Sequence, residues 1–123
     1  MDRTGLQGHS ILVVEDEPLI ALDIVEGLQS AGALVLTAHS LQDGLKLAAQ
    51  SELSAAVLDF GLGDSEGTTI CQCLKQRGIP LVFHTGYTPL PRACGSEIVI
   101  TKPASREQLV AAIQGLLRSP RPE

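Results

Sequence analysis

Short apolar runs alternate along this chain with longer segments in which apolar residues recur at every third or fourth position. The short runs are nearly continuous and contain β-branched residues, which is typical of strands covered on both faces. They predict strands at residues 10–14, 33–38, 53–58, 80–84 and 97–100. The longer segments have helical spacing and predict helices at 18–31, after the N-cap candidate Ser40, at 68–76 and at 104–118.

The regular alternation of strand and helix predicts a parallel sheet wrapped by helices on both faces. We therefore expect an α/β, doubly wound, five-stranded parallel sheet of the flavodoxin type, with strand order 2-1-3-4-5. A chain of 123 residues has room for one such domain. We place this domain at residues 10–118, between a disordered or frayed N-terminal tail at 1–9 and a C-terminal tail at 119–123.

The composition narrows the classes of function. The formal net charge is −5 and the Lys and Arg residues do not cluster, which argues against direct binding of nucleic acid. The chain has no N-terminal apolar segment and no run of about 18 consecutive apolar residues, so we expect no membrane association and a cytoplasmic protein. Cys71, Cys73 and Cys94 lack paired metal-ligand spacing and are expected to be reduced packing residues.

Acidic and polar residues follow directly after four of the predicted strands. Glu15 and Asp16 follow the first strand, and Asp59, Thr85 and Lys102 follow the third, fourth and fifth. Because ligands bind at the carboxyl ends of the strands in a doubly wound sheet, we expect these side chains to converge. Three adjacent carboxylates favour a hard divalent cation, Mg²⁺ with Mn²⁺ as the alternative. Lys102 would then supply a fixed positive charge, Thr85 a hydroxyl donor, and Asp59 a nucleophile that can form an acyl phosphate.

Each of these residues also has an ordinary structural interpretation. Taken alone, the acids at 15–17 are typical of a first helical turn, Asp59 of a loop turn and Lys102 of a solvated surface. Their joint occurrence at three strand ends favours a phosphoryl site. Two other classes share this architecture, a flavodoxin-like carrier and an aspartyl-phosphate hydrolase. Acids after the first strand would repel a flavin phosphate, and the D-x-D pattern of the hydrolase is absent there.

Four short motifs give a more specific indication. The acidic pair lies in VVEDEP, Asp59 in VLDFGLGD, Thr85 in FHTGY and Lys102 in ITKPA. On these motifs the chain, from Ile11 to about Leu117, resembles the response-regulator receivers of bacterial two-component pathways. The resemblance implies a phosphoacceptor signalling domain and not an enzyme, with a histidine kinase or a histidine phosphotransfer protein as donor. It implies an output through protein contact, through phosphate shuttling or as a phosphate sink.

The resemblance also implies a role for each site residue. Asp16 and Asp59 would bind Mg²⁺ together with the backbone carbonyl of Gly61, and Glu15 would hold metal-bound water. Thr85 and the site lysine would contact the phosphoryl oxygens, so that the domain assists its own phosphorylation. A degenerate pseudo-receiver that uses the fold only for binding is the remaining alternative, and the retained site residues argue against it.

Two features depart from the typical receiver. The stretch between Thr85 and Lys102 is short and contains prolines, so we expect a truncated or irregular fourth helix and irregular structure at 86–96. Val99 occupies the position, three residues before the lysine, where most receivers have a switch aromatic. The segment PLVFHTGY instead resembles the FATGUY subgroup, which lacks this aromatic and is coupled to kinases of the HWE or a related type. We expect phosphorylation to draw Thr85 inward and Tyr87 to repack as part of the output.

An apolar stripe on the first predicted helix is a candidate contact for the kinase. Pro18, Leu22 and Val25 lie on the side of this helix that faces away from the expected core. We assign them, together with Pro103 beside the site lysine, to kinase docking. The sequence does not indicate the downstream partner, and we expect a monomer or a weak dimer.

Overall fold

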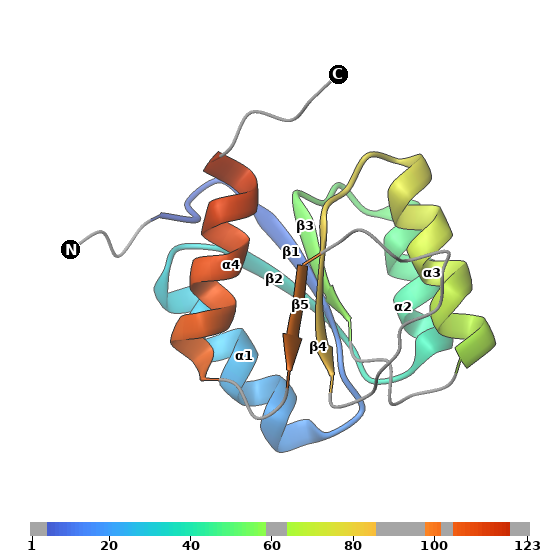
Figure 1. Cartoon of the computed structure of the whole chain (residues 1–123), viewed down its shortest axis with the longest axis horizontal. Coiled ribbons are helices and arrows are strands. Elements are labelled where there is room, and N and C mark those ends of the chain that lie inside the picture. The colour runs from blue at the N-terminus through green and yellow to red at the C-terminus, as the bar shows by residue number, and fades with distance from the viewer. Residues whose placement is uncertain (1–4, 59–63, 86–97, 102–104, 119–123) are drawn as a thin grey trace.

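Five parallel strands form one sheet in the computed structural model of this chain (Figure 1). The structure describes residues 5–58, 64–85, 98–101 and 105–118. The elements are β1 (Ser10–Val14), α1 (Pro18–Ser30), β2 (Leu34–Ala38), α2 (Leu41–Gln50), β3 (Ala55–Leu58), α3 (Asp64–Gln76), β4 (Leu81–Thr85), β5 (Ile98–Thr101) and α4 (Arg106–Arg118). Their hydrogen-bonded order is β2-β1-β3-β4-β5, and every neighbouring pair is parallel. The predicted α/β fold with a parallel sheet is confirmed.

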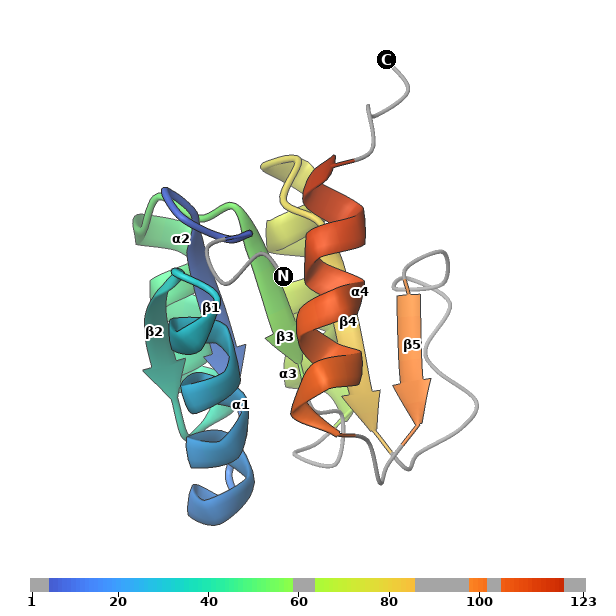
Figure 2. The same cartoon turned by 90° about the vertical axis from the view of Figure 1, so that its left-hand side faces the viewer.

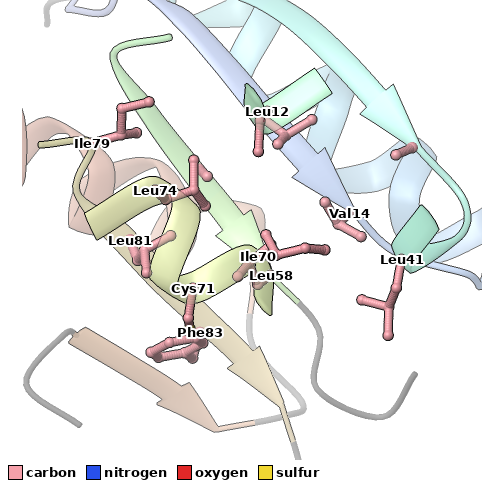
Figure 3. Packing of buried hydrophobic residues seen from close by; sticks show 13 residues of the cluster. Leu12, Val14, Leu41, Leu58, Ile70, Cys71, Leu74, Ile79, Leu81 and Phe83 are labelled. Atoms are coloured by element: carbon pink, nitrogen blue, oxygen red, sulfur yellow. The ribbon is translucent and has the colours of Figure 1, made fainter. Parts of the chain in front are cut away.

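Helices cover both faces of the sheet, with α1 and α4 on one face and α2 and α3 on the other (Figure 1). Side chains alternate along each strand, so Ile11 and Val13 enter the α1/α4 layer whereas Leu12 and Val14 enter the α2/α3 layer. All four are at most 1% exposed. The α2/α3 layer extends across β3 and β4 to the ring of Phe83 (Figure 3). Burial on both faces explains why β1 and β3 are continuous apolar runs in the sequence, whereas β2 at the edge of the sheet is only partly buried.

The helix ends follow from local chemistry. Pro18 takes the first position of α1, where its missing N–H is not needed. Ser40 is the N-cap of α2 and accepts the N–H of Asp43 at 3.1 Å, as its position in the sequence predicts. Helix α3 begins at Asp64, earlier than predicted. Gly67 was predicted to lie in a turn, but it lies in the first part of this helix. The predicted truncation of the helix between β4 and β5 falls outside the described residues.

Gly44 allows α2 to approach the end of β1 closely. A Cβ atom at this position would lie 2.9 Å from Cγ2 of Val14 and 3.3 Å from Cδ1 of Ile70. Glycine normally weakens a helix interior, but here any side chain would push the helix away from the sheet. The close packing therefore brings the start of α2 next to the residues that follow β1.

The prediction of a frayed segment at 1–9 is wrong for the part that the structure describes, which begins at Gly5. Leu6 is 0% exposed and its N–H donates to the carbonyl oxygen of Ala31 at 2.8 Å. The carbonyl oxygen of His9 accepts the N–H of Leu34 at 2.9 Å. A single leucine among polar residues has no periodicity, so only its contacts reveal that it belongs to the core.

The cysteines differ from one another. Cys71 is buried in the α2/α3 layer and is disulfide-bonded, so the expectation that all three cysteines are reduced is wrong for this residue. Cys73 is a free thiol, and Cys94 lies outside the described residues. Spacing along the sequence cannot show which sulfurs approach one another, because their separation depends on the packing of distant segments.

Candidate functional site

The carboxyl ends of the strands meet at one edge of the sheet, the lower edge in Figure 2, where the arrowheads point the same way. Val14 ends β1 and pairs both with Leu58, the end of β3, and with Ala38, the end of β2. Thr85 and Thr101, the ends of β4 and β5, pair with each other. The segments that carry the predicted site residues therefore leave the sheet at the same edge.

Glu15 and Asp16 follow β1 but lie in different environments. Glu15 is 1% exposed and is the only polar or charged side chain buried among the described residues, whereas Asp16 is exposed. Oε2 of Glu15 accepts the N–H of Glu17 at 3.3 Å. Glu17 is the N-cap of α1 and makes no side-chain capping hydrogen bond. The side chain of Glu17 therefore does not cap this helix, and the carboxylates of Glu15 and Asp16 offer the hard oxygen donors that a divalent cation prefers.

The end of β2 holds the backbone of Glu15. The N–H of Glu15 donates to the carbonyl oxygen of Ala38 at 3.0 Å, and Nδ1 of His39 lies 3.2 Å from the carbonyl oxygen of Glu15. No role for His39 follows from the sequence pattern alone. Its position directly after the second predicted strand was the available signal, since residues after strands line the ligand edge of such a sheet.

The other predicted site residues are described only in part. Thr85 is the last residue of β4, and Val99 lies on β5 opposite Phe83. The remaining predicted residues lie outside the described part of the chain: Asp59, Gly61, Tyr87, Lys102 and Pro103. Within the described part, no group of three or more His, Cys, Asp or Glu side chains is placed to hold a metal ion. The predicted metal set depends on Asp59 and Gly61, so this observation does not test it.

The start of α1 presents apolar side chains to solvent. Of the predicted stripe, Pro18 is exposed and Leu22 is 52% exposed, whereas Val25 is partly buried. Leu19 is 81% exposed and enlarges the patch. Leu19 was not among the residues predicted for docking, although its three-residue separation from Leu22 places both on one side of a helix. We call Pro18, Leu19, Leu22 and Val25 the α1 patch.

Comparisons with known proteins support the assignment of the fold and the family. A family model described as the response regulator receiver domain matches residues 11–114. A probable transcriptional regulatory protein of Picosynechococcus is 35% identical over 122 residues, covering 88% of this chain and 49% of that protein. A CheY-like receiver domain of Methanospirillum hungatei has a TM-score of 0.79 at 28% identity, covering 91% of this chain and 94% of the other.

A second structure is a response regulator of Burkholderia pseudomallei solved with a phosphorylated aspartic acid, a calcium ion and citrate. It has a TM-score of 0.73 at 27% identity, covering 85% of this chain and 66% of the other. The chain spans about half the length of the curated relatives it matches. None of the helices in the described ranges is long and apolar enough to cross a membrane.

Receiver domains are signalling domains that are phosphorylated by histidine kinases, and phosphoaspartate and Mg²⁺ binding are typical of them. The family model covers most of this chain, and the parallel sheet places the acidic pair directly after β1, at the carboxyl ends of the strands. The chain therefore belongs to the response regulator receiver domain family.

Proposed function

We propose that this receiver accepts a phosphoryl group from a histidine kinase on Asp59, with Mg²⁺ bound beside it. The observation that carries the proposal is the pairing of Val14 with Leu58. Because of this pairing, the acids after β1 and the segment that begins with Asp59 leave the sheet from neighbouring positions. Glu15 and Asp16 bring to that edge the oxygen donors that Mg²⁺ prefers.

Each site residue has a distinct task in this reaction. Asp16, Asp59 and the backbone carbonyl of Gly61 would hold the cation, Mg²⁺ or Mn²⁺, and Glu15 would orient a water bound to it. When bound, the cation neutralises charge on the phosphoryl oxygens. A carboxylate oxygen of Asp59 bonds to phosphorus, the bond between phosphorus and the histidine nitrogen of the donor breaks, and the imidazole leaves. Thr85 and the lysine that follows β5, Lys102, stabilise the phosphoryl oxygens.

The output is assigned to the segment that begins at the end of β4. The position opposite Phe83 on β5 is Val99, so the ring that most receivers have there is missing. Phosphorylation draws Thr85 towards the phosphoryl group and repacks Tyr87, as expected for a FATGUY-like receiver. The signal then passes on by protein contact, by phosphate shuttling or by competition for the kinase as a phosphate sink.

Phosphorylation by a small donor tests the proposed function. Incubation with acetyl phosphate and Mg²⁺ is expected to raise the intact mass by one phosphoryl group, and EDTA is expected to prevent this gain. Addition of Mn²⁺ in excess of EDTA should restore it, because Mn²⁺ accepts similar oxygen ligands. A chain with no gain in Mg²⁺ would be a pseudo-receiver, and continuous release of phosphate without an aspartyl phosphate would indicate a hydrolytic enzyme. Either result would contradict the proposal.

The α1 patch, together with Pro103, is proposed as the docking site for a kinase of the HWE or a related type. Leu22→Glu is expected to lower the rate of phosphotransfer from an autophosphorylated HWE-type kinase by about tenfold, because it places a charge in an apolar contact. The rate with acetyl phosphate should stay unchanged, since that donor needs no docking surface.

Leu34→Glu is the matched control for docking, because Leu34 is 66% exposed at the opposite end of the sheet. This variant should accept phosphate from the kinase at the rate of the parent. Equal losses in the two variants would remove the docking role of the α1 patch. Transfer from other histidine kinases, with none from a panel of HWE-type enzymes, would remove the HWE assignment.

A further inference from the structure

Two consecutive residues at the end of β2, Ala38 and His39, contact the main-chain N–H and carbonyl groups of Glu15. Its N–H donates to the carbonyl oxygen of Ala38 at 3.0 Å. Its carbonyl oxygen lies 3.2 Å from Nδ1 of His39. A carbonyl oxygen can only accept a hydrogen bond, so this contact requires the proton on Nδ1 of the imidazole.

The imidazole occupies the place of a missing ladder hydrogen bond. In a parallel ladder, a residue that donates to Ala38 would accept from the N–H of Ser40. The chain turns at Ser40, which is the N-cap of α2, and no backbone hydrogen bond from Ser40 to Glu15 is present in the described ranges. His39 therefore adds a hydrogen bond between the two segments at Glu15, one residue beyond the last paired position of β1.

The orientation of this carbonyl matters for the acidic site. The carbonyl of Glu15 and the N–H of Asp16 belong to one planar peptide group, so a bond to the carbonyl also restricts where the Cα atom of Asp16 lies. Glu15 is buried and its carboxylate accepts the N–H of Glu17, which holds the far side of the same turn. Hydrogen bonds to the carbonyl and to the carboxylate of Glu15 therefore fix the turn that carries the exposed Asp16.

We propose that His39 is a positioning residue for the cation site, because its Nδ1–H holds the Glu15–Asp16 peptide group in the orientation that cation binding needs. This inference rests on the proposed function, since it takes Asp16 as a ligand of the cation. His39 itself neither binds the cation nor touches the phosphoryl group. By ordering this peptide group before the cation binds, His39 reduces the conformational entropy that is lost on binding.

Cation affinity in three variants tests this role. Binding of Mn²⁺ alone, followed by electron paramagnetic resonance of the free ion at one fixed pH, gives the Kd for each protein. His39→Ala is expected to raise this Kd about threefold to tenfold, the range that one net hydrogen bond supplies. His39→Asn is expected to stay within about twofold of the parent, because its amide N–H₂ can donate to the same carbonyl.

His9→Ala is the matched control, because Nδ1 of His9 lies 2.9 Å from Oγ of Ser54 near the opposite ends of the strands. It removes an imidazole contact of the same kind and should leave the Kd unchanged. An unchanged Kd in His39→Ala would overturn the positioning role. A raised Kd in His39→Asn equal to that in His39→Ala would overturn it as well, because general loss of packing would then be the cause.

A measurement without metal separates this inference from the proposed function. The backbone ¹⁵N order parameter of Asp16 in the metal-free protein should fall in His39→Ala and recover in His39→Asn, because the lost bond frees the peptide group. An unchanged order parameter would overturn the inference even if the parent binds Mn²⁺ tightly. A parent that binds no Mn²⁺ would instead overturn the proposed function together with the metal role of His39, whatever the order parameters show.

Discussion

Replacement of Asp59 by asparagine is expected to abolish the Mg²⁺-dependent mass gain from acetyl phosphate. The carboxylate is the nucleophile that forms the acyl phosphate, and a neutral amide of almost the same shape cannot replace it. The substitution also removes a negative charge from the predicted cation site, so the affinity for Mn²⁺ should fall at the same time. Intact-mass measurement after prolonged incubation is the readout, with no phosphorylated species expected.

The control for this variant is Asp43→Asn, which makes the same chemical change at an exposed position in the first turn of α2. Asp43→Asn should gain one phosphoryl group like the parent. Both variants should also unfold cooperatively in urea, which separates lost chemistry from lost folding. A full mass gain in Asp59→Asn would mean that another residue is the phosphoacceptor, and the proposed function would have to be abandoned.

Truncation of Leu6 to alanine is expected to lower the free energy of unfolding by about 2 to 5 kcal/mol. Leu6 is 0% exposed and packs in the α1/α4 layer with Ile11 and Leu28. Truncation would remove buried methyl groups and leave a cavity that the backbone bond from Leu6 to Ala31 prevents from closing fully. Urea denaturation followed by circular dichroism measures the change.

Leu34→Ala provides the comparison, because Leu34 is 66% exposed and its truncation should change stability by no more than about 0.5 kcal/mol. The folded fraction of Leu6→Ala should still accept phosphate on Asp59, since Leu6 precedes β1 and lies at the amino ends of the strands. If Leu6→Ala were as stable as Leu34→Ala, the segment before β1 would be frayed in solution, as the sequence alone predicts.

Only some features of the acidic site can be predicted from the sequence. Glu15 and Asp16 stand out in the sequence because they end an apolar run, and the pairing of Val14 with Leu58 agrees with the expectation that the strand ends share an edge. The sequence could not show that Glu15 is buried while Asp16 is exposed, nor that His39 contacts the backbone of Glu15. Both facts depend on where the end of β2 lies relative to β1, which no local pattern encodes.

The sequence by itself determined the alternation of strands and helices, the two-sided burial of β1 and β3 and the cap at Ser40. These features follow from side-chain period and local hydrogen bonding. Only the tertiary structure decided that Leu6 belongs to the core, that Cys71 is disulfide-bonded and that His39 holds Glu15. The contacts of Leu6 with Ala31 and of His39 with Glu15 join segments that are distant in the sequence. Such contacts depend on how the layers pack, and a pattern along one segment carries no information about the distance to another.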